Sequence, residues 1–173
     1  MGNNLGLTEN LPKLVTLLEE QITLYRHLLE VVRKEKDILI SANLDDLNET
    51  NRTKEAMLLK IRAIEAQRVK AASDVAQDLG LSPENPRLLE MAIYLPDEAG
   101  DRLRSIHSVL ELLLKRVQEL NGQNEVLVQS ALVNVTGAMN SIRGTLQDKP
   151  KYQRHGDVDP GVTPSGQLVR REA

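Results

Sequence analysis

The sequence predicts an all-α protein: an antiparallel bundle of three long helices with a short connecting helix and a disordered C-terminal tail. The 173 residues suffice to bury a core, yet they include no Cys, Trp or Phe and only three Tyr. Leu, Ile, Val, Ala and Met must therefore do the packing. Apolar residues recur at steps of three and four over long segments, which is the spacing of coiled-coil-like helix packing.

The first helix is expected from Leu11 to about Ile40. Thr8 or Asn10 is a suitable cap, and Pro12 is tolerated in a first turn. The apolar stripe is wide enough to face two neighbouring helices. Its members are Leu11, Leu14, Leu18, Ile22, Tyr25, Leu29 and Val32, widened by Leu17, Leu24, Leu28, Val31 and Ile38.

The second helix is expected to begin after Asn43, which reads as an N-cap because two acidic residues follow in the first turn. It should end near Leu79, with Gly80 as the residue after the cap. The short break at residues 41–43 predicts an antiparallel hairpin. The expected apolar positions are Leu47, Leu58, Ile61, Ile64, Val75 and Leu79.

A proline-rich segment, residues 80–100, separates this hairpin from the third long helix. A short helix is expected from Asn85-Pro86 through Tyr94, and the long one from Asp97 to about Leu146. We expect residues 1–147 to form a single helical domain and residues 148–173 a flexible tail. The third helix has the seam Leu103, Ile106, Leu110, Leu113, Val117, Leu120, Asn124, Leu127 and Ala131.

Sequence motifs argue against several classes of function. None of the three histidines lies in a Glu-x-x-His or His-Glu-x-x-His pattern, and phosphate-binding and nucleophile motifs are missing, so we expect neither enzyme activity nor a cofactor or metal. A net charge of −3 without a basic block argues against nucleic-acid binding. No segment is apolar enough to insert into a membrane, and no secretory signal is visible, so we expect a cytoplasmic protein.

Residues 126–142, VLVQSALVNVTGAMNSI, contain no charged side chain in a chain that is 27% charged. On a helical wheel this uncharged stretch has a main apolar face and a second, smaller one at Val126 and Val133. Its many Val, Asn, Ser, Thr and Gly residues are mediocre or poor helix formers, so packing must contribute to its order. Either a foreign helix, the protein's own bundle or a homodimer would cover it.

The order of these features resembles the FlgN-type flagellar export chaperones. The segment KEKDILISANLDDLNETNRTKEAMLLKI is similar to the family's alternating Glu/Lys run, short break, Leu-x-x-Leu and Lys before a Leu pair. An irregular middle follows, then a long helix with an Asn cluster at residues 120–124 and an apolar end. The tail matches the family's Tyr-x-x-x-Gly element at Tyr152–Gly156. The resemblance covers about residues 8–160.

The resemblance implies a chaperone that holds the C-terminal segment of hook–filament junction proteins and delivers them to the export gate. Client binding would fall within about residues 120–146. By the same resemblance Tyr152 would dock to the cytoplasmic domain of the gate. Two alternatives are a homodimeric coiled-coil scaffold and a chaperone of another type III secretion client. The expected client contacts are Leu127, Val128, Ala131, Leu132, Val135, Met139 and Ile142.

Overall fold

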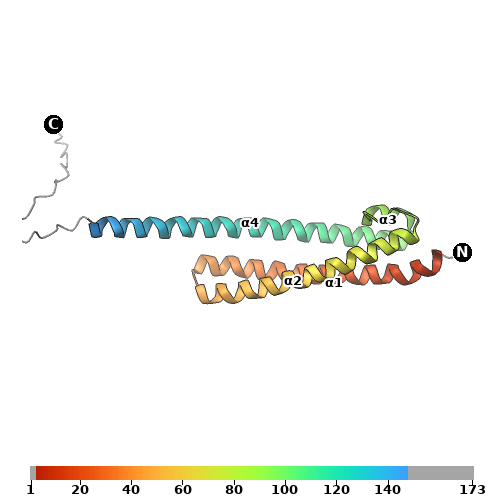
Figure 1. The fold of residues 1–173 in the computed structure, drawn as a ribbon, viewed down its shortest axis with the longest axis horizontal. Coiled ribbons are helices and arrows are strands. Elements are labelled where there is room, and N and C mark those ends of the chain that lie inside the picture. Colours follow the sequence, from red (N-terminus) through yellow and green to blue (C-terminus); the bar gives the residue numbers. More distant parts are fainter. Residues whose placement is uncertain (1–2, 148–173) are drawn as a thin grey trace, which may run out of the picture. The chain divides into compact units, whose positions relative to one another are not determined.

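The computed structural model describes residues 3–147, which form four helices (Figure 1). They are α1 (Asn3–Ser41), α2 (Leu44–Asp78), α3 (Leu88–Tyr94) and α4 (Asp97–Gln147). The all-α prediction is confirmed. The chain divides into two compact units, Met1–Gln129 and Ser130–Ala173, and the boundary falls within α4. The predicted flexible tail, residues 148–173, lies outside the described residues.

The hairpin of α1 and α2 turns over two residues, Ala42 and Asn43. Ala42 has φ 54°, in the left-handed region that reverses the chain sharply. Asn43 caps α2 as predicted, because its side-chain oxygen accepts a hydrogen bond from the backbone N–H of Asp46 at 3.4 Å. Asp45 and Asp46 place negative charge at the positive end of the helix dipole. The local sequence thus makes the tight turn on its own.

The other end of α2 is a Schellman motif centred on Gly80, which has φ 73°. The N–H of Gly80 donates to the carbonyl of Gln77 at 3.0 Å, and that of Leu81 donates to the carbonyl of Ala76 at 2.8 Å. The predicted role of Gly80 is confirmed, and the proline-rich connection starts here.

The predicted start of α1 near Leu11 was wrong, because the helix already begins at Asn3 and Pro12 lies inside it. Contacts with the end of α2 hold the additional turns. Asn10 Nδ2 donates to Asp78 Oδ2 at 2.9 Å, and Gly6 lies so close to the Asp78 carboxylate that a Cβ at this position would displace the carboxylate. These tertiary contacts offset the backbone hydrogen bond that Pro12 cannot donate.

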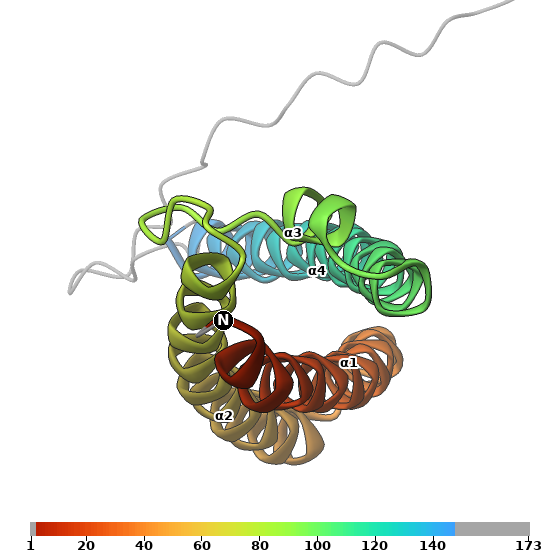
Figure 2. The same ribbon diagram turned by 90° about the vertical axis from the view of Figure 1, so that its right-hand side faces the viewer.

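The core of the first unit lies between α1, α2 and α4 and is closed at one end by α3. Figure 2 shows the three long helices end-on with α3 beside α4. The largest fully buried side chains are Leu14, Leu18, Val32, Val75, Met91 and Leu103. The predicted α4 seam is buried from Leu103 to Asn124, with Leu113 half-buried. One predicted core residue of α2, Leu58, is instead 47% exposed.

A polar cluster between α1 and α2 also joins the helices of this unit. Arg68 donates two hydrogen bonds to Glu65, at 2.8 and 2.6 Å, and Gln21 Nε2 donates to Glu65 Oε2 at 2.6 Å. Hydrogen bonding by Arg68 lowers the pKa of Glu65, and Glu65 in turn raises the pKa of Arg68. Burial is the main cause of the raised pKa of Tyr25 nearby. The ionised pair is therefore the stable form at neutral pH.

Candidate partner-binding surface

The environment of α4 changes at Asn124, which is the last buried residue of the described part of this helix. Leu127 is half-buried, and every residue from Val128 to Leu146 is exposed. Ala131, the last member of the predicted seam, is among the exposed residues. The uncharged stretch therefore begins where burial within the first unit stops.

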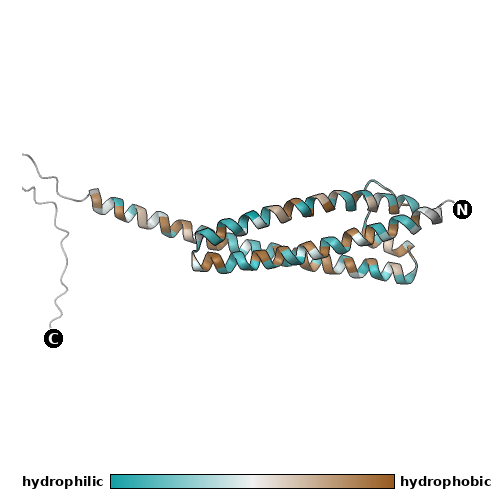
Figure 3. Ribbon diagram, turned by 90° about the horizontal axis from the view of Figure 1, so that it is seen from below, coloured by the Kyte–Doolittle hydropathy of each residue, from teal (hydrophilic) through white to brown (hydrophobic). Residues whose placement is uncertain are grey.

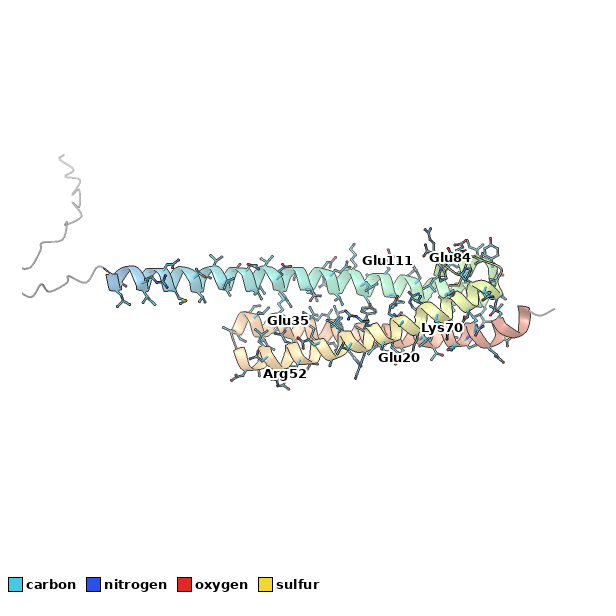
Figure 4. All side chains as sticks on the ribbon, viewed as in Figure 1. Glu20, Glu35, Arg52, Lys70, Glu84 and Glu111 are labelled. Carbon is cyan, nitrogen blue, oxygen red and sulfur yellow. The ribbon has the colours of Figure 1, made fainter. Side chains whose placement is uncertain are left out.

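Asn124 is held in a polar node made of three side chains from three helices: Glu35 on α1, Lys54 on α2 and Asn124 on α4. Asn124 Nδ2 donates to the carbonyl of Val32 and to Glu35 Oε2, both at 3.0 Å. Lys54 Nζ donates to the same Glu35 oxygen at 2.8 Å. Glu35 and Asn124 are 8% and 3% exposed, so the node replaces apolar packing at this level of the core. Figure 4 labels Glu35 on α1.

The node brings together two sequence segments that were singled out separately. The alternating Lys34-Glu35-Lys36 run lies on α1, and the Asn cluster of residues 120–124 lies on α4. Besides the bond from Asn124 to Glu35, Lys36 Nζ donates to Gln123 Oε1 at 2.9 Å. The sequence alone did not predict this contact, because the two segments are far apart in the chain.

Beyond the node, six large apolar side chains form what we call the exposed seam. Their spacing is four, three, four, three and four residues, so that they share one helical face. Between 45% and 61% of each residue's surface is exposed. Figure 3 shows brown, hydrophobic residues recurring along this segment of α4. The exposed seam consists of Val128, Leu132, Val135, Met139, Ile142 and Leu146.

Five of the seven predicted client contacts belong to the exposed seam, and Ala131 is exposed next to it. Leu127 differs because it is half-buried in the first unit. The structure adds Leu146, which the prediction omitted although the same spacing reaches it across Arg143. Tyr152 lies outside the described residues. That these side chains contact a client stays a prediction.

The predicted second face is also exposed. Val126 and Val133 are 65% and 69% exposed, and seven residues apart they lie on one side of the helix. Each helical residue advances by about 100°, which turns Val133 away from its neighbour Leu132 and from the centre of the exposed seam. This smaller face offers an internal comparison for the exposed seam.

One polar side chain of the uncharged stretch bonds within its own helix. Thr136 Oγ1 donates to the carbonyl of Leu132 at 2.8 Å, so this hydroxyl is used by its own helix. Among residues 3–147 no group of three or more acidic or histidine side chains is placed to hold a metal ion. No helix of the described chain has the length and apolarity to cross a membrane. Exposed apolar side chains are the most prominent surface that this segment offers to a partner.

Comparison with protein families decides the affiliation. Residues 1–160 match the family described as FlgN protein. The chain belongs to the FlgN family. Neither the curated proteins nor the solved structures that were compared include a match to it.

The FlgN affiliation confirms the identification made from the Glu/Lys run, the Asn cluster and the tail motif. FlgN proteins are cytoplasmic chaperones of flagellar export. This general role agrees with a helix that carries an uncovered apolar face.

Proposed function

We propose that this FlgN protein binds the C-terminal region of flagellar hook–filament junction proteins through the exposed seam. Binding would keep these clients soluble and allow their delivery to the cytoplasmic domain of the export gate. The observation that supports this most is the run of six large apolar residues from Val128 to Leu146, all on one face and all exposed. A face of this kind in a chaperone family calls for a covering partner.

The spacing of the exposed seam favours one class of partner, an amphipathic helix. Alternating steps of three and four suit knobs-into-holes packing at a crossing angle of about +20°. From Val128 to Leu146 the seam extends about 27 Å at 1.5 Å per residue. A client helix of about five turns, apolar at the same spacing, would cover all six side chains. This is helix-in-groove recognition, with the apolar area supplying the affinity.

The lack of charge determines how selective this surface is. Coiled-coil partners and orientations are commonly selected by charged residues flanking the seam. Here the flanks within residues 126–142 carry only Gln, Ser, Asn, Thr and Gly besides apolar residues. Client choice would then depend on apolar shape, and more than one junction protein with a matching helix would fit.

For delivery, we propose that Tyr152 contacts the cytoplasmic domain of the export gate. This proposal rests on the Tyr-x-x-x-Gly element within the matched residues 1–160. A tyrosine combines a large apolar ring with a hydroxyl and is common among binding hot spots. Tyr152→Ala should keep client affinity within about twofold and impair export of the client in cells, since hot-spot truncation costs binding only where the side chain is used. Normal export by this variant would remove the role from Tyr152.

A second candidate is a homodimeric scaffold in which the exposed seam pairs with that of another copy. The observation in its favour is again the missing charge, because two identical uncharged faces do not repel each other. In this case the dimer would form without a client and persist when one is added.

The deciding experiment is isothermal titration of the full-length protein with the C-terminal helical segment of a junction protein. We expect a 1:1 complex that Val135→Asp abolishes, because an unpaired carboxylate would be buried in the interface. Circular dichroism should show the helices intact in this variant, since Val135 is 58% exposed in the free protein. A tight dimer that releases no heat with the client segment would instead establish the scaffold.

A further inference from the structure

The apolar spacing of α4 does not by itself determine which part of the helix packs on the hairpin. Residues of the seam recur every seven positions, and the series continues past the buried part to the exposed Ala131. Moving α4 by seven residues would put one apolar seam residue in place of another at most levels. Such a slip amounts to about 10 Å along the axis. The series consists of Leu103, Leu110, Val117, Asn124 and Ala131.

A slip in one direction would bury the start of the proposed client surface. It would bring Ala131 to the place of Asn124, and Leu127 would replace the buried Leu120. Val128 would move to the place of the half-buried Asn121, whereas the seam residues from Leu132 onward would take places that are exposed. The client face would thus lose its first turn to the protein's own core. Something in the structure must therefore disfavour this register.

We propose that Asn124, together with Glu35 and Lys54, is a register lock that keeps the start of the client surface out of the bundle. In the observed register the Asn124 amide donates to Glu35 and to the carbonyl of Val32. After the slip, Ala131 would offer Glu35 no donor. A buried carboxylate that loses a partner is disfavoured, and so is a buried amide without acceptors.

The slip would also move Asn124 into an apolar environment. It would occupy the place of Val117, which belongs to a buried cluster with Leu28, Leu29 and Ile61. No side chain of that buried group accepts a hydrogen bond. A single buried polar residue in a helical seam is known to specify register at a cost in stability, which is the role that the geometry assigns to Asn124.

The register itself concerns the first unit alone and holds whether or not a client binds. The effect on binding rests on the proposed function. Asn124 is thus a positioning residue, and its test must measure the position of α4 as well as affinity.

Register can be measured directly because the chain contains no cysteine. Spin labels at Lys13→Cys and Gln118→Cys, both exposed positions of the first unit, would report the position of α4 by pulsed EPR. The variant Glu35→Leu/Asn124→Leu removes the buried carboxylate and amide and leaves the half-buried Lys54, so that neither register buries an unpaired polar group of these two residues. Asn124→Leu alone leaves the Glu35–Lys54 pair. Lys115→Leu adds leucine at an exposed site of the same helix and serves as the matched control.

We expect a single distance in the labelled parent and in the Lys115→Leu control. The double variant should show a second population shorter by about 10 Å, one heptad at 1.5 Å per residue. When half of the molecules are shifted, the apparent Kd for the client segment should rise by up to about twofold, because the shifted half offers a client face that lacks its first turn.

An unchanged single distance in both Asn124 variants would contradict the role of Asn124 as a register lock. The register of α4 would then be attributed to its packing with α3, whose Met91 is fully buried. A shifted population with unchanged client affinity would refute the occlusion of the client surface. Failure of the parent protein to bind any client segment would reject the proposed function, while the distance measurement would still decide the register.

Discussion

Truncating one exposed apolar side chain, Leu132→Ala, should weaken client binding without weakening the fold. Leu132 is 59% exposed in the free protein, so that fraction of its surface is available for burial by a partner. Complete burial of a leucine side chain contributes about 1.5–3 kcal/mol. Covering 59% of it contributes about 1–1.8 kcal/mol, which corresponds to a 5- to 20-fold change in Kd.

The neighbouring residue supplies the matched control. Val133 is 69% exposed, but helical geometry turns it away from the exposed seam. Val133→Ala should change Kd by less than about twofold, since a side chain outside an interface contributes little to binding. Titration calorimetry with one client segment measures both variants, and circular dichroism should show unchanged helicity in each.

Two results would refute this reasoning. Equal loss of affinity in both variants would mean that the client surrounds the helix rather than covering one face. Loss of helicity in Leu132→Ala alone would mean that Leu132 supports the fold, in conflict with its exposure.

Further predictions concern stability, salt and pH. Leu103→Ala, at a fully buried site, should lower the free energy of unfolding by about 2–5 kcal/mol in denaturant titrations, and a loss below 1 kcal/mol would contradict its place in the core. Client Kd should change less than about twofold between 50 and 500 mM NaCl, because Arg143 is the single charged residue among residues 126–146. Glu65 has a lowered folded-state pKa, so its stabilising effect is present above the unfolded value of about 4.3 and is lost as pH falls through the folded value. Glu65→Gln should therefore reduce the decrease in the free energy of unfolding at acidic pH. An unchanged dependence of this free energy on pH would show that Glu65 makes no such contribution.

Local signals predicted most of the helix boundaries. Asn43, which two acidic residues follow, begins α2, and Gly80 with its left-handed φ ends it. Both residues act through contacts only a few positions away in the chain. Those contacts are visible in the sequence. The start of α1 was missed because the Asn10–Asp78 hydrogen bond joins residues 68 positions apart. Local sequence patterns do not reveal a hydrogen-bond partner so distant in the chain.

The candidate site was predicted only in part for a related reason. Missing charge and the repeat of apolar residues identified the uncharged stretch from the sequence. The residue of α4 at which burial stops could not be predicted from the sequence, because Asn124 fits the spacing of the seam as well as Leu120 does. The structural role of Asn124 depends on Glu35, 89 residues earlier in the chain, and on Lys54, which follows the turn between α1 and α2. Long-range polar pairing was the missing information.

The two-residue turn between α1 and α2 has a consequence for the order of events during synthesis. Closing so short a connection costs little chain entropy, so the hairpin can form once about the first 80 residues have left the ribosome. The residues of α4 then pack against the hairpin that α1 and α2 have already formed, and Leu103 packs before Asn124 because it is synthesised first. The apolar residues from Val128 to Leu146 leave the ribosome after the residues of α4 that pack inside the first unit. A nascent chain would thus complete its own folding before it exposes the surface meant for another protein.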